Sequence, residues 1–175
     1  MSPINSKEKG SEFERRIARI LSKWWGEEFH RTPGSGGLHW KKDNRVAGDI
    51  VAPMGSNFPF SIENKKWEDW EIIQLLKGTG DIENWWKQCE GDAIRVSKEP
   101  LLIFTKNYAP IYMMMLLSTF RLMCPNILFN IFIVYNAKNN YRPRVVCLLN
   151  DFISKVSKED VLGAGIIRKS VQLGN

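Results

Sequence analysis

The chain has 175 residues, with 25 Lys and Arg against 19 Asp and Glu, which gives a formal net charge of +6. Hydrophobic residues make up 43% and charged residues 25%, ordinary proportions that exclude wholesale disorder. A chain of this length buries enough surface to form one stable core, so we expect a single domain over residues 1–175. The basic excess indicates a polyanionic partner such as a nucleic acid.

Cysteine usage and hydrophobicity point to an intracellular protein. Cys89, Cys124 and Cys147 are widely spaced and lack CxxC spacing, which favours reduced thiols over a disulfide framework or a zinc site. Residues 1–10 lack the apolar run of a signal peptide, and the most apolar stretch, residues 111–124, is too short and too polar for a membrane span. We therefore expect a soluble, cytoplasmic protein with no membrane partner.

The first third of the chain predicts one helix and two strands. Apolar residues recur at helical spacing over residues 7–25, and Gly26 supplies a stop signal. A glycine-rich loop follows at 31–37. Residues 46–52 form a short predicted strand, and residues 58–65 alternate apolar and polar side chains as a second strand. We expect these two strands to pair as a hairpin.

The remainder of the chain continues the alternation of helices and strands. Residues 67–98 predict one or two helices with a break near 78–80, and residues 110–124 predict a core helix. Further strands are predicted at 101–105, 131–135 and 144–149. Residues 1–8 are expected to be flexible, and the last 25 residues give no clear pattern. This order predicts an α/β domain with a central mixed β-sheet flanked by helices.

Three residues of the two paired strands carry the chemistry of the sequence. Glu63 and Lys65 are two positions apart on a strand, so both side chains leave the same face. Asp49 lies on the preceding strand, close enough to converge on them. Two carboxylates and a backbone carbonyl form a hard-oxygen site that suits Mg²⁺. The adjacent ammonium can orient or deprotonate a metal-activated water, or neutralise transition-state charge, as phosphodiester hydrolysis requires.

A simpler interpretation competes with this one. A Glu-x-Lys pattern occurs by chance in many chains, and alternating charges on a strand are usually a solvated face. Here it is the only such pattern in the chain, and it lies within an apolar strand preceded by the strand that carries Asp49. Glu14 lies at the edge of the helix's apolar stripe and not opposite it, and its simpler interpretation is a surface ion pair with a nearby Arg or Lys.

Asp49 followed by Glu63-x-Lys65 resembles the PD-(D/E)xK nuclease superfamily. Three upstream motifs, Lys9-Gly-Ser-Glu-Phe-Glu14-Arg15, Arg31 before Pro33-Gly-Ser35-Gly, and Gly48-Asp49-Ile-Val-Ala52, are similar to archaeal-type Holliday-junction resolvases, which some bacterial viruses also carry. The resemblance covers residues 9–106, and it implies a restriction-endonuclease-like fold.

The resemblance also implies a role for each matching residue. Asp49 and Glu63 would ligate Mg²⁺, with Mn²⁺ as a substitute, together with the backbone carbonyl of Asn64. Glu14 would complete the acidic cluster as a catalytic residue and metal ligand, and Lys65 would assist the attacking water. Two positions depart from the family pattern: Asn64 stands where an apolar residue is usual, and Gly48 stands in place of the proline.

Further contacts to the substrate are expected from the loop and the basic residues around it. Ser35 would lie near the scissile phosphate, although a Gly-Ser-Gly segment is more often a plain linker. We expect DNA contacts at Arg15, Arg31, Lys41, Lys42, Arg45 and Lys66.

The function predicted first is a Mg²⁺-dependent endonuclease that resolves four-way DNA junctions in recombination and repair. Two symmetric nicks across a junction require two active sites, so we expect a homodimer. One alternative is another PD-(D/E)xK endonuclease that cuts ordinary duplex DNA, of the restriction or repair type. The other is a DNA-binding module without catalytic activity.

Overall fold

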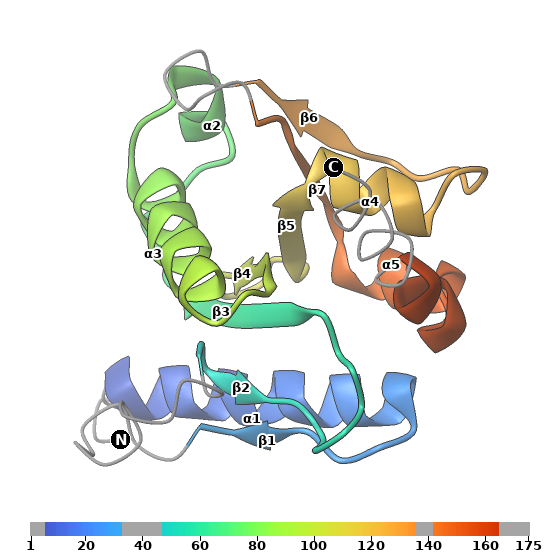
Figure 1. The fold of residues 1–175 in the computed structure, drawn as a ribbon. Helices are drawn as coiled ribbons and strands as arrows, with labels where there is room; N and C mark the ends of the chain where they lie inside the picture. The colour runs from blue at the N-terminus through green and yellow to red at the C-terminus, as the bar shows by residue number, and fades with distance from the viewer. Residues whose placement is uncertain (1–5, 33–46, 136–141, 165–175) are drawn as a thin grey trace.

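The computed structural model describes residues 6–32, 47–135 and 142–164 and is an α/β fold built on one mixed sheet (Figure 1). The sheet has five strands in the order β3-β4-β5-β7-β6. Their bounds are Phe60–Lys66 for β3, Glu99–Thr105 for β4, Tyr112–Leu116 for β5, Phe132–Val134 for β6 and Arg144–Leu148 for β7. Strands β3 and β4 are parallel, and the other neighbours are antiparallel. The predicted mixed sheet flanked by helices is therefore confirmed.

Helices cover both faces of the sheet. Helices α1 (Ser6–Trp25), α4 (Leu117–Met123) and α5 (Leu149–Lys155) share one apolar cluster with alternate residues of the strands. Helices α2 (Gln74–Lys77) and α3 (Asp81–Arg95) share a second cluster with the intervening strand residues. This alternation is the period of two that a sheet buried on both faces requires.

Helix α1 follows the predicted apolar spacing and lies along β3 (Figure 1). Phe13, Ile17 and Leu21 are each less than 5% exposed. The helix ends at Gly26, whose φ of 79° is left-handed and whose N–H donates to the Ser22 carbonyl. It begins at Ser6.

The predicted hairpin between residues 46–52 and 58–65 is wrong. Strand β2 (Ile50–Val51) instead pairs antiparallel with β1 (His30–Arg31). Only Gly48 bridges to Ile62 of β3, and that bridge is parallel. Residues 52–59 include a turn in which the Ser56 N–H donates to the Pro53 carbonyl, but they carry the chain back to the start of β3, so the Gly48 segment runs parallel to β3.

The predicted core helix at 110–124 is wrong in its first half, which is strand β5. Tyr112–Leu116 pairs with β4 on one edge and with β7 on the other. A strand that is buried on both faces reads as a continuous apolar run, which periodicity cannot distinguish from a buried helix. Pairing on two edges then overrides the helical preference of its methionines. The second half of the segment forms α4 as expected.

The other predicted elements are present with small shifts of their ends. Strands β4, β6 and β7 correspond to the expected strands at 101–105, 131–135 and 144–149. Helices α2 and α3 are separated by the expected break, with Gly78 and Gly80 both at positive φ. The C-terminal residues that gave no clear pattern include α5 and a further helical segment at 158–164. Within the described ranges, no helix combines the length and the apolar character that crossing a membrane requires.

Candidate active site

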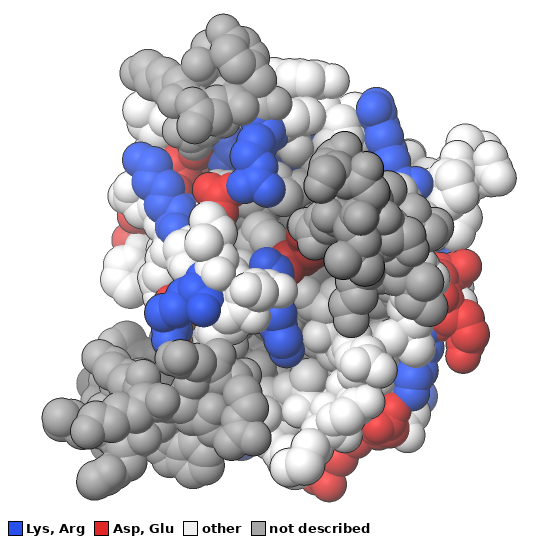
Figure 2. All heavy atoms as spheres, viewed as in Figure 1, with Lys and Arg blue, Asp and Glu red and all other residues white. Residues whose placement is uncertain are grey.

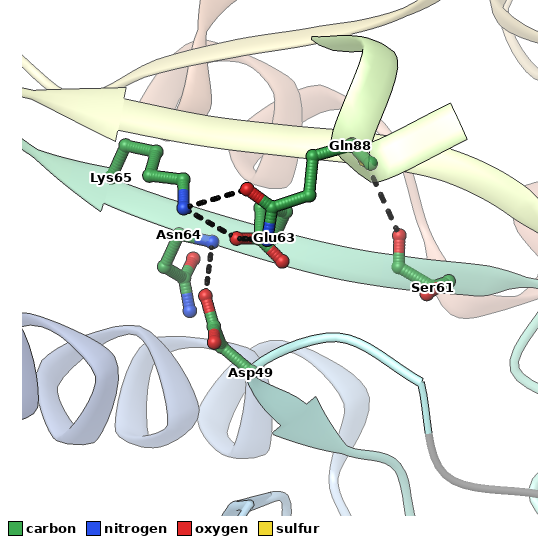
Figure 3. A network of polar contacts seen from close by, with 7 residues as sticks. Asp49, Ser61, Glu63, Asn64, Lys65 and Gln88 are labelled. Atoms are coloured by element: carbon green, nitrogen blue, oxygen red, sulfur yellow. Dashed lines mark hydrogen bonds and ion pairs between the residues drawn. The ribbon is translucent and has the colours of Figure 1, made fainter. Parts of the chain in front are cut away.

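Glu63 and Lys65 lie on the face of β3 that α3 covers (Figure 3). The Lys65 Nζ lies 2.6 Å from the Glu63 Oε1, so the two side chains share one face as their spacing predicts. The Glu63 side chain is 4% exposed and that of Lys65 is 26% exposed. The pair is therefore a largely buried ion pair whose ammonium remains accessible, unlike the solvated strand face of the simpler interpretation.

Gln88 of α3 contacts both members of this pair, a role that no sequence pattern predicts. Its Nε2 donates to the Glu63 Oε1 at 2.7 Å, and its Oε1 accepts from the Lys65 Nζ at 3.2 Å (Figure 3). One amide thus fixes both charged groups. The available signal was weak: a polar residue directly before the buried Cys89, at the border of the apolar face of α3.

Asp49 is held against the edge of β3 by two hydrogen bonds. Its backbone N–H donates to the Ile62 carbonyl at 2.7 Å, and its Oδ2 accepts from the Asn64 N–H at 2.8 Å. Figure 3 shows the Asp49 carboxylate below β3, beside the Asn64 side chain. In an extended strand the N–H and C=O of one residue leave the same edge, so the Asn64 carbonyl also faces this side.

The glycine at position 48 is required by the close approach of this segment to β3. Gly48 has a φ of +81°, and a Cβ atom there would lie 2.2 Å from the Ile62 carbonyl oxygen. A proline can adopt neither this φ nor this contact. The departure of Gly48 from the superfamily pattern therefore has a local steric cause in this chain.

Burial is the main reason why the pKa values of both carboxylates are raised. Burial, followed by the negative charge of Glu63, raises the pKa of Asp49 to about 7. Burial also raises the pKa of Glu63, against the opposing effect of Lys65. A divalent cation between them would relieve both effects, and carboxylate and carbonyl oxygens are suitable ligands for Mg²⁺ or Mn²⁺. The donors at this edge of β3 therefore fit such a cation.

Glu14 is engaged elsewhere in this structure. Its Oε2 accepts from the Arg31 Nε in an ion pair that joins α1 to β1, and both side chains are less than 30% exposed. Its charge still contributes to the raised pKa values of Asp49 and Glu63. In the part of the chain that the structure describes, no three acidic, His or Cys side chains lie close enough to hold a metal by themselves. The ion pair is thus present, and the acidic cluster that includes Glu14 is not assembled.

The expected DNA contacts are only partly within the described residues. Arg15 is exposed on α1, Lys66 is half-buried at the end of β3, and Arg31 is paired with Glu14. Ser35, Lys41, Lys42 and Arg45 lie outside the described residues. In the left half of Figure 2, Lys and Arg side chains are interspersed with acidic ones, so the described part of this face does not form a patch of one sign.

Comparison with known proteins places these observations in a family. Residues 5–163 match the family described as "Phage putative PDDEXK endonuclease". The match extends past residue 106, where the motif resemblance ends, and so takes in the strands and helices from β5 to α5. The chain is also similar to protein D14 of Escherichia phage T5, with 32% identity over 108 residues, or 59% of this chain and 66% of that protein. No solved structure matches the chain.

Proposed function

Because the chain belongs to the family of phage PDDEXK endonucleases, we propose that it cuts DNA with a divalent cation held by Asp49 and Glu63. PD-(D/E)xK nucleases generally use divalent metals, and the family implies DNA as the substrate. The observation that carries the proposal is that β3 holds the Glu63–Lys65 ion pair while the Asp49 carboxylate is hydrogen-bonded to the same strand at Asn64, near enough for the charge of Glu63 to raise the pKa of Asp49.

The cation would be bound by oxygen ligands alone. We propose the carboxylates of Asp49 and Glu63 and the backbone carbonyl of Asn64, with Mg²⁺ as the natural cation and Mn²⁺ as a substitute. When bound, the cation would polarise the scissile phosphate and activate a water molecule for attack. Glu14 would complete the acidic cluster once Arg31 leaves it for a DNA phosphate, an exchange that the Glu14–Arg31 ion pair makes available.

Lys65 would act on the reacting groups from the α3 side, and Gln88 would support it. The Lys65 ammonium would orient the attacking water and offset the negative charge that develops on the phosphate. Gln88 would hold Glu63 and Lys65 in register, since its amide contacts both. The DNA backbone would be contacted by the other predicted basic residues, Arg15, Lys41, Lys42, Arg45 and Lys66. Ser35 would lie near the cleaved phosphate.

We propose four-way DNA junctions as the substrate and a homodimer as the active form. The motifs around Glu14, Arg31 and Gly48 support this choice through their resemblance to Holliday-junction resolvases. Symmetry supports the dimer, since one chain carries one Asp49, Glu63 and Lys65 set and a junction requires two nicks. Roles in recombination and repair follow from this choice of substrate.

A cleavage assay tests the proposal. Wild-type protein and the Asp49→Asn variant are incubated with labelled linear duplex and four-way junction in Mg²⁺, Mn²⁺, Ca²⁺ or EDTA. We expect paired symmetric nicks in the junction with Mg²⁺ or Mn²⁺, and none with EDTA. Asp49→Asn is expected to lose cleavage and to keep DNA affinity within a few-fold, because it removes a metal ligand and no basic residue.

The same assay decides between the alternatives. Equal cutting of linear duplex would favour a restriction or repair type of endonuclease over a junction resolvase. Binding without cleavage in any cation would favour a non-catalytic DNA-binding module. Wild-type rates in Asp49→Asn would show that the cation site has been assigned to the wrong residues.

A further inference from the structure

Asn64 carries a buried side-chain amide that has no polar partner. The residue lies between Glu63 and Lys65 on β3 and is 6% exposed. Among the described residues, neither its Oδ1 nor its Nδ2 has a hydrogen-bond partner, and both atoms are inaccessible to solvent. An amide offers two N–H donors and a carbonyl oxygen with two lone pairs, so the full capacity of this group is unused.

The surroundings of Asn64 favour an apolar side chain. Phe60 and Ile62 precede it on the same face of β3, and both pack into the apolar cluster beneath α1. A buried amide without partners lowers the stability of a fold, whereas an apolar residue of similar size would not. An amide at this position is therefore best explained by a polar group that it meets in another state of the site.

Asp49 is the polar group next to this amide. The Asn64 backbone N–H already donates to the Asp49 Oδ2 at 2.8 Å. In Figure 3 the Asn64 side chain extends from β3 toward the same carboxylate, on the side away from Gln88. Asn64 thus lies where its amide can contact Asp49 from the α1 side, while Glu63 and Lys65 face α3.

We propose that Asn64 is a positioning residue, whose side-chain amide fixes the Asp49 carboxylate in its cation-binding orientation. When the Asp49 carboxylate turns toward the cation, the Asn64 amide N–H would donate a hydrogen bond to it. The amide that has no partner without metal would therefore have one in the cation-bound site. Groups that orient a metal ligand typically change metal affinity by about 10–100-fold when they are removed. The inference rests on the proposed cation site and assigns it a residue beyond its oxygen ligands.

Two substitutions of Asn64, by residues that are nearly isosteric with each other, separate the effect of hydrogen bonding from that of packing. Asn64→Val removes every side-chain polar group, and Asn64→Thr has almost the same shape with a hydroxyl. Calcium serves as a hard-cation probe, with binding measured by titration calorimetry and with the melting temperature of the metal-free protein measured in parallel. We expect Asn64→Val to weaken Ca²⁺ binding by about tenfold or more. We expect Asn64→Thr to recover part of that loss.

The melting temperature of Asn64→Val should change in the opposite direction to its Ca²⁺ affinity. Asn64→Val should melt at or above the wild-type temperature without metal, because it removes an unpartnered buried amide. A purely structural role predicts the reverse: a lower melting temperature and unchanged Ca²⁺ affinity. Gln74→Leu is the matched control, since the Gln74 Oε1 on α2 is also buried and unpartnered among the described residues, away from Asp49. Its Ca²⁺ affinity should equal that of the wild type.

Three outcomes overturn the proposal. The first is a Ca²⁺ affinity of Asn64→Val equal to that of the wild type. The second is an equal loss of Ca²⁺ affinity in the Val and Thr variants, and the third is the same loss of affinity in Gln74→Leu. Failure of the cation site itself is distinguishable, because the wild-type protein would then bind no Ca²⁺ and Asp49→Asn would behave like it. Wild-type binding that is lost in Asp49→Asn and retained in Asn64→Val would overturn the role of Asn64 alone.

Discussion

Gly48 and Ile62 approach so closely that the carbonyl oxygen of Ile62 lies 2.2 Å from the place where a Cβ atom of residue 48 would be. This contact sets the position of Asp49, whose N–H donates to that same carbonyl at 2.7 Å. The distance from β3 to the Asp49 carboxylate therefore depends on the absence of a side chain at the preceding residue.

Gly48→Ala is expected to displace Asp49 and destabilise the fold. The left-handed φ alone costs about 1–2 kcal/mol for an alanine, and the contact with Ile62 adds to it. We expect a lower free energy of unfolding in urea, together with weakened Ca²⁺ binding. Gly91→Ala on α3 is the control, because a Cβ there meets nothing within 4 Å, and it should stabilise the protein by about 0.5–1 kcal/mol. Wild-type Ca²⁺ binding in Gly48→Ala would contradict the prediction.

Asp49→Asn is expected to make the stability of the metal-free protein less sensitive to a rise in pH from about 4 to about 7. The pKa of Asp49 in the folded protein is raised from 3.8 to about 7, so the folded state retains a proton that the unfolded chain releases. The wild-type protein should accordingly lose stability as the pH rises from about 4 to about 7, by on the order of 3–4 kcal/mol. Urea unfolding at pH 5 and pH 8 in EDTA measures the change, which should be smaller in Asp49→Asn. The same pH dependence in both proteins would contradict the raised pKa.

Gln88→Leu is expected to lower kcat by about 10–100-fold with little change in the KM for DNA, because it releases Glu63 and Lys65 without removing either. Steady-state cleavage rates in saturating Mg²⁺, measured over a range of DNA concentrations, give both constants. The control is Lys87→Ala, which removes an exposed cation from the adjacent position of α3. An increase in KM alone would make Gln88 a simple contact to DNA.

Glu14→Gln tests whether the Glu14–Arg31 ion pair is a resting arrangement of the site or only a surface contact. If Glu14 joins the acidic cluster in the DNA complex, cleavage falls sharply while stability moves by roughly 0–1 kcal/mol. Cleavage rates and thermal melting of the same preparation decide it. Glu12→Gln, an exposed residue on α1, provides the control. Unchanged cleavage in Glu14→Gln would remove Glu14 from the site.

The sequence predicts those parts of the molecule that local patterns determine. The apolar spacing of Phe13, Ile17 and Leu21 identifies α1, and the alternation along β3 identifies the shared face of Glu63 and Lys65. Strand β5 escapes detection because burial on both faces removes its alternation. The contact of Gln88 with Glu63 is not predicted, because it arises from the packing of α3 on β3 and joins residues far apart in the chain. The direction of the Asp49 segment depends on the path of residues 52–59, whose turn at Pro53–Ser56 is compatible with a hairpin and with the parallel return that the structure has.

The final prediction concerns the homodimer and where its interface lies. The apolar run at residues 111–124 is not available as an interface, because most of its apolar side chains are buried in the core of the monomer. Strand β6 is at the edge of the sheet, and Phe132 and Ile133 on it are 61% and 39% exposed. An exposed apolar edge strand is a template for pairing with a second chain, and a two-fold axis beside it would join two sheets (Figure 1).

Phe132→Lys is accordingly expected to convert a dimer into a monomer, because it introduces a charge at the apolar edge. Light scattering at micromolar concentration measures the oligomeric state, and a junction assay measures whether the two nicks occur together. Doubling the net charge of +6 to about +12 in the dimer should also make junction binding strongly dependent on salt, and the monomer less so. Leu76→Lys is the control, since Leu76 on α2 is 83% exposed but lies on no sheet edge. A wild-type monomer that binds junction and duplex equally would remove the resolvase proposal and leave a nuclease of another specificity.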